Sequence, residues 1–380
     1  MVRILVLDPV DLRSSLPSGI KTFILNLIET STHAQWRILG MESSSYNESG
    51  VSPSFDTNEF EFQSIGKKYR SDFLKIRIPD SILYCCNLVK YRNRIEADLL
   101  HSHKIEIGFV LLMMFPQISL VQFVHNSSSD LTNRKTSGSI WRFLPKLHSF
   151  VTKFVYSRAF RVVTFTVKEF HAARLHSDNV LLARNGYDSK VFFWNRKLID
   201  MSQENQVINV LWAGRFEFEK NPEFSLALTS HLVSTTRLVR LHLVGSGSLE
   251  PKLRAQIQKE GIGNNVTMHG ILSKSELSEL MNKCDVFLQT SHYEGSPNSV
   301  LEALACGLPV VTIHTGDPDR LIQDHFNGFR IIDFDKELFS EAIERSQRLD
   351  RDSIAKQVVA RSIERTFPEL SNFATQLENY

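Results

Sequence analysis

The sequence predicts an α/β protein of two doubly wound domains, and two observations support this fold class. The chain has 380 residues, about the length of two domains. Short apolar runs alternate with amphipathic helical patterns along nearly all of it, which is typical of parallel sheets covered by helices on both faces. We place the domains at residues 1–190 and 191–365, and we expect a last helix, at 366–380, to pack back on the first domain.

The first apolar run opens the chain, and we interpret it as a strand because it lacks the segment order of a signal peptide. The strands expected in the first half are Val2–Leu7, Trp36–Leu39, Leu99–Leu100, Leu120–Val124 and Arg161–Phe165. The helices expected between them are Ile20–Glu29, Ser81–Ile95 and Ile105–Phe115. Pro116 and nearby polar residues interrupt the most membrane-like stretch, 107–124, which therefore predicts a helix and a buried strand rather than a membrane span.

The second half alternates more regularly. Its expected strands are Val207–Ala213, Leu241–Val244, Val266–Met268, Val286–Gln289, Pro309–Ile313 and Phe329–Ile332. Its expected helices are Pro222–Leu232, Glu250–Lys259, Ser275–Lys283, Ser299–Ala305 and Pro318–Asp324. Ligands of open parallel sheets bind beyond the carboxyl ends of the strands, so the loops that follow these strands are the candidate site.

Composition excludes several classes of protein. With 44 Lys+Arg against 42 Asp+Glu, the chain is too balanced for a nucleic-acid binder along its whole length. Residues 1–190 hold 24 basic and 17 acidic residues, whereas residues 191–380 hold 20 and 25, which suits two domains with different partners. The four cysteines, Cys85, Cys86, Cys284 and Cys306, have no zinc-site spacing, and we expect a cytoplasmic protein without disulfides.

The densest motif runs from Ser291 to Val311. A turn containing Glu294 leads from a strand into a helix that Asn298 or Ser299 is placed to cap, and the amino end of a helix attracts anions. Glu302 lies about one turn into this helix, so both carboxylates can face one ligand, one near a reacting group and one near a ribose diol. A capped helix with a solvated glutamate is the alternative.

A second motif joins a strand to a helix through Gly214, Arg215 and Lys220. The glycine permits a close approach to a ligand, and the two cations suit a phosphate group, unless they are merely surface charges. Gly245 begins a third turn of this kind. It lacks the complete glycine fingerprint of a dinucleotide cofactor site.

In this order, the three motifs resemble those of glycosyltransferase family 4, retaining enzymes of the GT-B fold. The resemblance is strongest from Val207 to Arg330 and implies two Rossmann-like domains that face each other across a cleft. Weaker matches in the first half and at the domain boundary are Pro17-Ser18-Gly19, His101-Ser-His103, Val124-His125 and Asn185-Gly186-Tyr-Asp188. Whether His101 or His103 reaches the site is left open.

The resemblance also implies roles for individual residues. Arg215 and Lys220 would bind the donor diphosphate, and Glu302 the ribose. Glu294 and His125 would lie at the reacting sugar as catalytic residues. The remaining donor-binding positions would be Gly19, Gly214, Gly245, Gly295, Ser296, Pro297, Asn298 and Ser299.

The family implies a retaining transfer of a hexose or N-acetylhexosamine from a nucleotide-diphosphate sugar, with UDP as the expected nucleotide. The expected acceptor is a glycan or polyprenyl-linked oligosaccharide in bacterial surface polysaccharide biosynthesis, such as O-antigen, capsule or exopolysaccharide. Two alternatives stay open: a nucleotide-sugar epimerase or phosphorylase on the same fold, and a non-enzymatic glycan-binding subunit.

We expect no cofactor and no metal. Two Asp-x-Asp strings, Asp317/Asp319 and Asp333/Asp335, resemble metal-binding sequences of another glycosyltransferase fold. Asp335, however, is placed to cap a helix.

Residues 134–174 are basic and contain a helix with regularly spaced apolar residues from Ile140 to Val155. Arg142, Lys146 and Lys153 fall mostly on another face of that helix. Such a helix suits peripheral contact with an anionic membrane at its cytoplasmic face, and a helix packed in the core with solvated lysines is the alternative.

Overall fold

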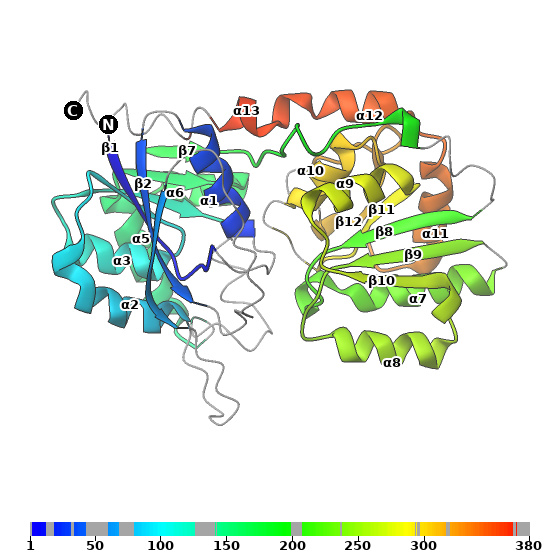
Figure 1. Cartoon of the computed structure of the whole chain (residues 1–380), viewed down its shortest axis with the longest axis horizontal. Coiled ribbons are helices and arrows are strands. Elements are labelled where there is room, and N and C mark those ends of the chain that lie inside the picture. Colours follow the sequence, from blue (N-terminus) through cyan, green and yellow to red (C-terminus); the bar gives the residue numbers. More distant parts are fainter. Residues whose placement is uncertain are drawn as a thin grey trace. The chain divides into compact units, whose positions relative to one another are not determined.

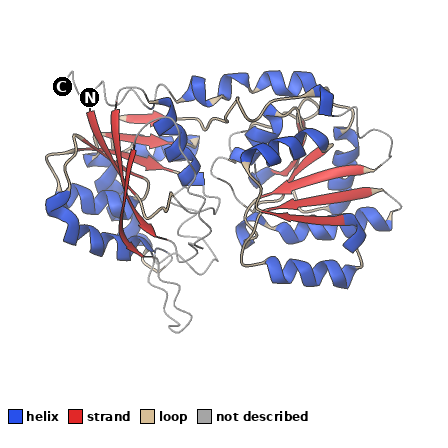
Figure 2. Cartoon of the chain, viewed as in Figure 1, coloured by secondary structure: helices blue, strands red, loops and turns tan. Residues whose placement is uncertain are grey.

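The structure is a computed structural model, and it describes residues 2–12, 19–31, 34–42, 60–67, 80–125, 141, 143–198, 207–235, 238–292, 294, 297–316, 320–367 and 370. The chain divides into two compact units. The first comprises residues 1–184 and 367–380, and the second residues 185–366. Each unit has a sheet between layers of helices (Figures 1 and 2). Whereas the sequence suggested a division after residue 190, the second unit begins at Asn185.

The first unit contains a parallel sheet in the order β3-β2-β1-β4-β5-β6-β7. Its strands are β1 (Val2–Leu7), β2 (Ala34–Glu42), β3 (Phe60–Lys67), β4 (Leu99–Ser102), β5 (Ser119–Val124), β6 (Arg161–Thr164) and β7 (Val180–Leu182). The strand order reverses between β1 and β4, which creates a topological switch point at their carboxyl ends. The sequence analysis missed β3 and β7, the two edge strands.

Helices cover the first sheet through apolar faces. They are α1 (Gly19–Thr30), α2 (Asp80–Tyr91), α3 (Ile105–Met114), α5 (Pro145–Arg158) and α6 (Val167–Arg174). Tyr84 and Leu88 of α2 pack in one cluster with Leu5 and Leu7 of β1. The stretch 107–124 is confirmed as a helix followed by a buried strand, because α3 and β5 occupy it.

The second unit contains a parallel sheet in the order β10-β9-β8-β11-β12-β13, with a switch point between β8 and β11. Its strands are β8 (Ile208–Ala213), β9 (Val239–Val244), β10 (Val266–Gly270), β11 (Val286–Gln289), β12 (Val310–Ile313) and β13 (Gly328–Ile331). All six were predicted, and the bounds of β11 match the prediction.

The helices of the second unit pack on both faces of its sheet (Figure 1). They are α7 (Pro222–Ser234), α8 (Glu250–Glu260), α9 (Lys274–Lys283), α10 (Asn298–Ala305), α11 (Lys336–Ser346), α12 (Arg351–Gln357) and α13 (Ile363–Thr366). Because strand residues alternate between faces, Val210 and Trp212 pack in the cluster of α7, α8 and α11. Leu211 and Ala213 join the cluster of α9, α10 and α12.

One predicted helix is wrong. Residues 320–323 carry no helix, and Arg320 has a positive φ of 52°. The side chain of Asn327 explains why, because it accepts a hydrogen bond from the Gln323 N–H at 2.7 Å and donates one to the Leu321 carbonyl at 2.9 Å. These contacts replace the hydrogen bonds of a helix with those of a loop. Most of the last helix expected at 366–380 lies outside the described residues.

The structure also bears on the cysteines and on membrane-spanning helices. All four cysteines are free thiols. In the described parts of the chain, none of the helices is long and apolar enough to cross a membrane.

Candidate functional site

The predicted donor motifs meet at the carboxyl ends of β8, β9 and β11, beside the switch point of the second sheet. Gly245 ends β9 with a φ of 132°, and a Cβ there would lie 1.9 Å from the carbonyl oxygen of Gly214. Only glycine fits this contact between two backbones. A Cβ at Gly214 would be tight, 3.2 Å from the Trp212 ring. The glycines therefore pack the two loops together.

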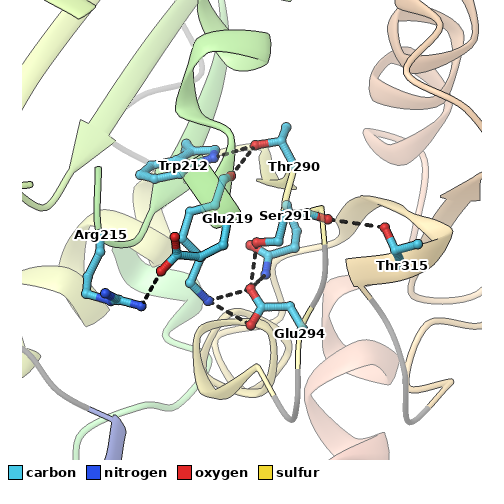
Figure 3. A network of polar contacts seen from close by, with 9 residues as sticks. Trp212, Arg215, Glu219, Thr290, Ser291, Glu294 and Thr315 are labelled. Carbon is cyan, nitrogen blue, oxygen red and sulfur yellow. Dashed lines mark hydrogen bonds and ion pairs between the residues drawn. The ribbon is translucent and has the colours of Figure 1, made fainter. Parts of the chain in front are cut away.

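The loop after β8 presents Arg215 beside a carboxylate. The Arg215 guanidinium donates to Glu219 at 2.7 Å, and about half of the arginine side chain is exposed, 52%, against 14% of the glutamate (Figure 3). Arg215 is therefore a solvent-facing cation anchored by a largely buried carboxylate. The sequence analysis did not single out Glu219.

Lys220 and Glu294 form the centre of the site although they are 74 residues apart in sequence. The Lys220 Nζ donates to both carboxylate oxygens of Glu294, at 2.6 and 2.7 Å. Gln289 and Ser291 donate to Oε1 of the same carboxylate, at 2.7 and 2.6 Å. Glu294 is thus held in one orientation as a hydrogen-bond acceptor, and its Oε2 has only the lysine as a described partner.

Buried hydrogen bonds hold the two loops at this distance. The indole N–H of Trp212 donates to the hydroxyl of Thr290 at 2.8 Å. That hydroxyl lies 3.0 and 2.8 Å from the carbonyl oxygens of Lys220 and Asn221. Figure 3 shows this chain of contacts running beside Glu219 and Glu294. These hydrogen bonds therefore join the loop that holds Lys220 to the loop that holds Glu294.

The amino end of α10 differs from the prediction. Asn298 and Ser299 are the first helical residues, and the cap residue is Pro297, which makes no side-chain cap. The Asn298 side chain instead accepts a hydrogen bond from Asn185 at 2.9 Å. The first N–H groups of the helix thus have no cap side chain and can bind an anion. Gly295 and Ser296 lie outside the described residues.

Glu302 sits on α10 with its carboxyl group surrounded by protein. Burial raises the pKa of Glu302 from 4.5 to about 7, with Lys274 lowering it and Asp188 raising it by their charges. Lys274 and Asp188 form a loose ion pair at 3.9 Å. A carboxyl group with this pKa would be stabilised as an anion by a hydroxyl donor such as a ribose diol.

In the first unit, His125 follows β5 and contacts His103, which follows β4. The Nδ1 of His103 lies 2.9 Å from the Nε2 of His125. Burial lowers the pKa of His125 to about 4 and that of His101 to about 3, so these rings are neutral near pH 7. His103 contacts His125, whereas neither ring nitrogen of His101 has a hydrogen-bond partner among the described residues.

The structure gives no binding role to several other positions that the sequence suggested. Gly19 is the first residue of α1, and a Cβ there would meet nothing within 4 Å. Asp335 caps α11 by accepting from the Leu338 N–H at 2.9 Å, whereas Asp317 and Asp319 lie outside the described residues. Within the ranges that the structure describes, no three His, Cys, Asp or Glu side chains gather as a metal site.

Sequence reasoning missed two residues that hold the charged groups of the site: Glu219, which pairs with Arg215, and Gln289, which donates to Glu294. A polar Gln289 closing an otherwise apolar strand was the one available signal.

Part of the chain matches a known protein family. Residues 200–357 match the family described as glycosyl transferases group 1. This segment belongs to that family. The glycosyl transferase segment contains Arg215, Lys220, Glu294 and Glu302.

The whole chain is similar to sucrose-phosphate synthase from Thermosynechococcus elongatus, with a TM-score of 0.81, 16% identity and coverage of 100% of both chains. The likeness shows the fold, so the two parallel-sheet units of this chain form a GT-B structure, as the resemblance implied.

Two curated proteins are similar to parts of this chain. An Escherichia coli UDP-Gal:alpha-D-GlcNAc-diphosphoundecaprenol alpha-1,3-galactosyltransferase is 21% identical over 272 residues, 68% of this chain and 68% of that protein. Glycogen synthase of Mycobacterium tuberculosis H37Rv is 25% identical over 230 residues, 58% of this chain and 53% of that protein. With other curated relatives the match covers 53% and 38% of their length, so the chain spans about half of such proteins or less.

Proposed function

We propose that the chain transfers a hexose or N-acetylhexosamine from a UDP sugar to a glycan or polyprenyl-linked acceptor, with retention of the anomeric configuration. The observation that carries this proposal is the Lys220–Glu294 pair at the carboxyl ends of β8 and β11, within a group 1 glycosyl transferase segment. Arg215 lies in the same loop as Lys220.

In this proposal the second unit binds the donor. Departure of UDP develops negative charge on the diphosphate, and fixed cations aimed at that charge lower the barrier. Arg215, Lys220 and the uncapped amino end of α10 supply positive charge there. Glu302 accepts from the ribose hydroxyls, and Glu294 offers Oε2 to a hydroxyl of the donor sugar.

His125 of the first unit serves the reacting sugar. A neutral imidazole exchanges hydrogen bonds with a sugar hydroxyl without attracting a counter-ion, and the lowered pKa of His125 keeps it neutral. The acceptor binds to this unit.

The relatives support the donor and acceptor classes. The Escherichia coli relative is named for a UDP-galactose donor and a diphosphoundecaprenol-linked acceptor. By analogy we assign this chain to bacterial surface polysaccharide synthesis.

The test is acceptor-dependent release of UDP. Purified protein is incubated with UDP-glucose, UDP-galactose or UDP-N-acetylhexosamines, with and without polyprenyl-diphosphate-linked sugars, and the product anomer is read by NMR. Release only in the presence of acceptor, with the donor's anomeric configuration kept, supports the proposal. Interconversion of nucleotide sugars without acceptor indicates an epimerase, and glycan binding without any turnover indicates a binding subunit.

We further propose that α5 contacts an anionic membrane. Its exposed face carries apolar and basic side chains together, with Leu147 47% and Phe150 60% exposed and Lys146 and Lys153 also exposed. Phe143, just before the helix, is 77% exposed. The single apolar face expected from sequence is therefore wrong: Val151 and Val155 are buried, whereas Leu147 and Phe150 face solvent. Exposed aromatic rings beside cations suit the headgroup region of a bilayer.

Flotation with liposomes of phosphatidylglycerol and phosphatidylcholine tests this surface. A basic residue near an anionic surface contributes about 1 kcal/mol, so Lys146→Glu/Lys153→Glu should abolish flotation at low salt. Lys252→Glu/Lys259→Glu on α8 makes the same charge change in the second unit and should leave it intact. No flotation of the unchanged protein, or equal loss in both variants, would refute the membrane contact.

A further inference from the structure

The contact between His103 and His125 joins the ends of two neighbouring strands. β4 and β5 are paired in parallel, with His101 opposite Val121 and Ser102 opposite Gln122. Each histidine is the residue that follows its strand, and this register places the two rings together. Their rings stack with centroids 5.2 Å apart, and Nδ1 of His103 lies 2.9 Å from Nε2 of His125.

The two rings differ in their surroundings. His103 is buried at 5% exposure and is sandwiched between His125 and Phe123, whose ring centroid lies 4.8 Å away. His125 is more exposed and stacks on Phe165 at 4.6 Å. Phe23 of α1 touches all of these rings edge-on. His103 is therefore the fixed member of the pair, and His125 is the one that a ligand can reach.

Packing alone does not account for an imidazole at position 103. A phenylalanine would fill the same stack of aromatic rings without burying two polar nitrogens. The Nε2 of His103 is buried without a hydrogen-bond partner in the described structure, so the only polar contact that offsets its burial is the one to His125. In a neutral pair one nitrogen donates and the other accepts, so the tautomer of each ring is tied to that of the other.

We propose that His103 is a positioning residue that fixes the ring plane and tautomer of His125 for the reacting sugar. The inference rests on the role proposed above for His125 and adds a residue that acts only through it. The donor nucleotide is assigned to the second unit, so loss of His103 should affect turnover and leave UDP affinity unchanged.

Two substitutions separate positioning from packing. In His103→Asn the side-chain amide occupies the place of Nδ1 and keeps the contact with His125, whereas in His103→Gln it reaches toward the place of Nε2 and loses that contact. We expect kcat to fall more than tenfold in His103→Gln and less than threefold in His103→Asn, with the Kd of UDP unchanged in both. His101→Gln is the matched control, since it removes a buried imidazole from the same strand and should keep kcat.

A spectroscopic measurement makes the proposal independent of turnover. The ring-nitrogen chemical shifts of His125 should report one tautomer in the unchanged protein and in His103→Asn, and a mixture in His103→Gln. Equal kcat in the Asn and Gln variants, or a single tautomer in both, would overturn the positioning role. An unchanged protein that has a single His125 tautomer but no transferase activity would instead refute the proposed function.

Discussion

At the scale of single residues, Glu302 shows how binding and stability oppose each other. Its pKa, raised by burial from 4.5 to about 7, means that the folded protein holds this proton more tightly than the unfolded chain. Below pH 4.5 both states are protonated and the group has no destabilising effect. Between pH 4.5 and about 7 the unfolded chain ionises this carboxyl group while the folded protein still keeps the proton, so the folded protein loses relative stability over this range, and the loss is complete above pH 7.

Glu302→Gln should therefore stabilise the protein at pH 8 and weaken donor binding. At about 1.4 kcal/mol per pKa unit, and because the glutamine amide is itself a polar group that must be buried, we expect a gain of about 2 kcal/mol at pH 8 and none at pH 4. Urea unfolding at both pH values measures the gain, and calorimetry with UDP measures the loss. A variant that is less stable than the original protein at pH 8 would contradict this assignment.

Lys220 provides a second test at this scale. Removal of a cation that faces a leaving diphosphate typically lowers the rate by about 10²–10³. Lys220→Ala should show this loss in kcat/KM, and Lys220→Arg should keep more activity because it keeps the charge beside Glu294. The exposed Lys190→Ala is the control. Equal rates in Lys220→Ala and the unchanged protein would remove Lys220 from the site.

At the scale of elements, Arg351 joins the carboxyl ends of two helices. It opens α12, and its guanidinium donates to carbonyl oxygens at the ends of α9 and α10, the shortest contact being 2.8 Å to Cys284. The Trp194 ring lies 4.2 Å from its centre. A cation placed at two helix carboxyl ends satisfies carbonyls that have no partner within their own helices. The helix that carries Glu302 is held in this way.

Arg351→Met should destabilise the second unit by about 2–4 kcal/mol, because several buried carbonyls lose their donor at once. Arg351→Lys should recover only part of this, since one ammonium cannot reach the ends of both helices. Chemical unfolding followed by tryptophan fluorescence measures both. Arg254→Met, which breaks an exposed pair with Glu250, should stay within about 0.5 kcal/mol of the original protein.

At the scale of the whole molecule, each unit has its own core, and the proposed nucleotide contacts lie in the second. A ligand that binds only the folded state stabilises it by about 2.7 kcal/mol at a concentration of 100 times Kd. UDP should therefore raise the unfolding temperature of the second unit by roughly 5–10 °C. If UDP, GDP and ADP all leave the calorimetric trace unchanged, the donor assignment fails.

Metal dependence is a separate prediction for the complete enzyme. We propose that protein cations and the amino end of α10 stabilise the leaving diphosphate, so that transfer continues in EDTA. With EDTA in roughly fivefold molar excess over any divalent metal in the assay, turnover should fall by less than about twofold, which is on the order of the assay error. Abolition by EDTA with recovery in Mn²⁺ would show that a metal supplies this charge and would direct attention back to the Asp-x-Asp strings.

The sequence by itself determined the fold class and most of the elements. Parallel strands covered on both faces require unbroken apolar runs, which is why Val286–Gln289 could be read with its bounds. Local rules were equally reliable for Asp335, whose cap depends on a residue three positions away. Gly214, Arg215 and Gly245 could likewise be placed at strand ends, since they follow β8 and β9 directly.

Only the tertiary structure decided how those residues meet. The pairing of Lys220 with Glu294, and of His103 with His125, depends on which strands are neighbours, and short-range periodicity does not contain that order. The same limit explains two errors. The Asn298 side chain does not cap its helix but accepts a hydrogen bond from Asn185, 113 residues away in sequence. Phe150 is exposed to solvent although its helical spacing suggested a core position. Local sequence sets what each element is, and long-range packing sets which of its side chains have partners.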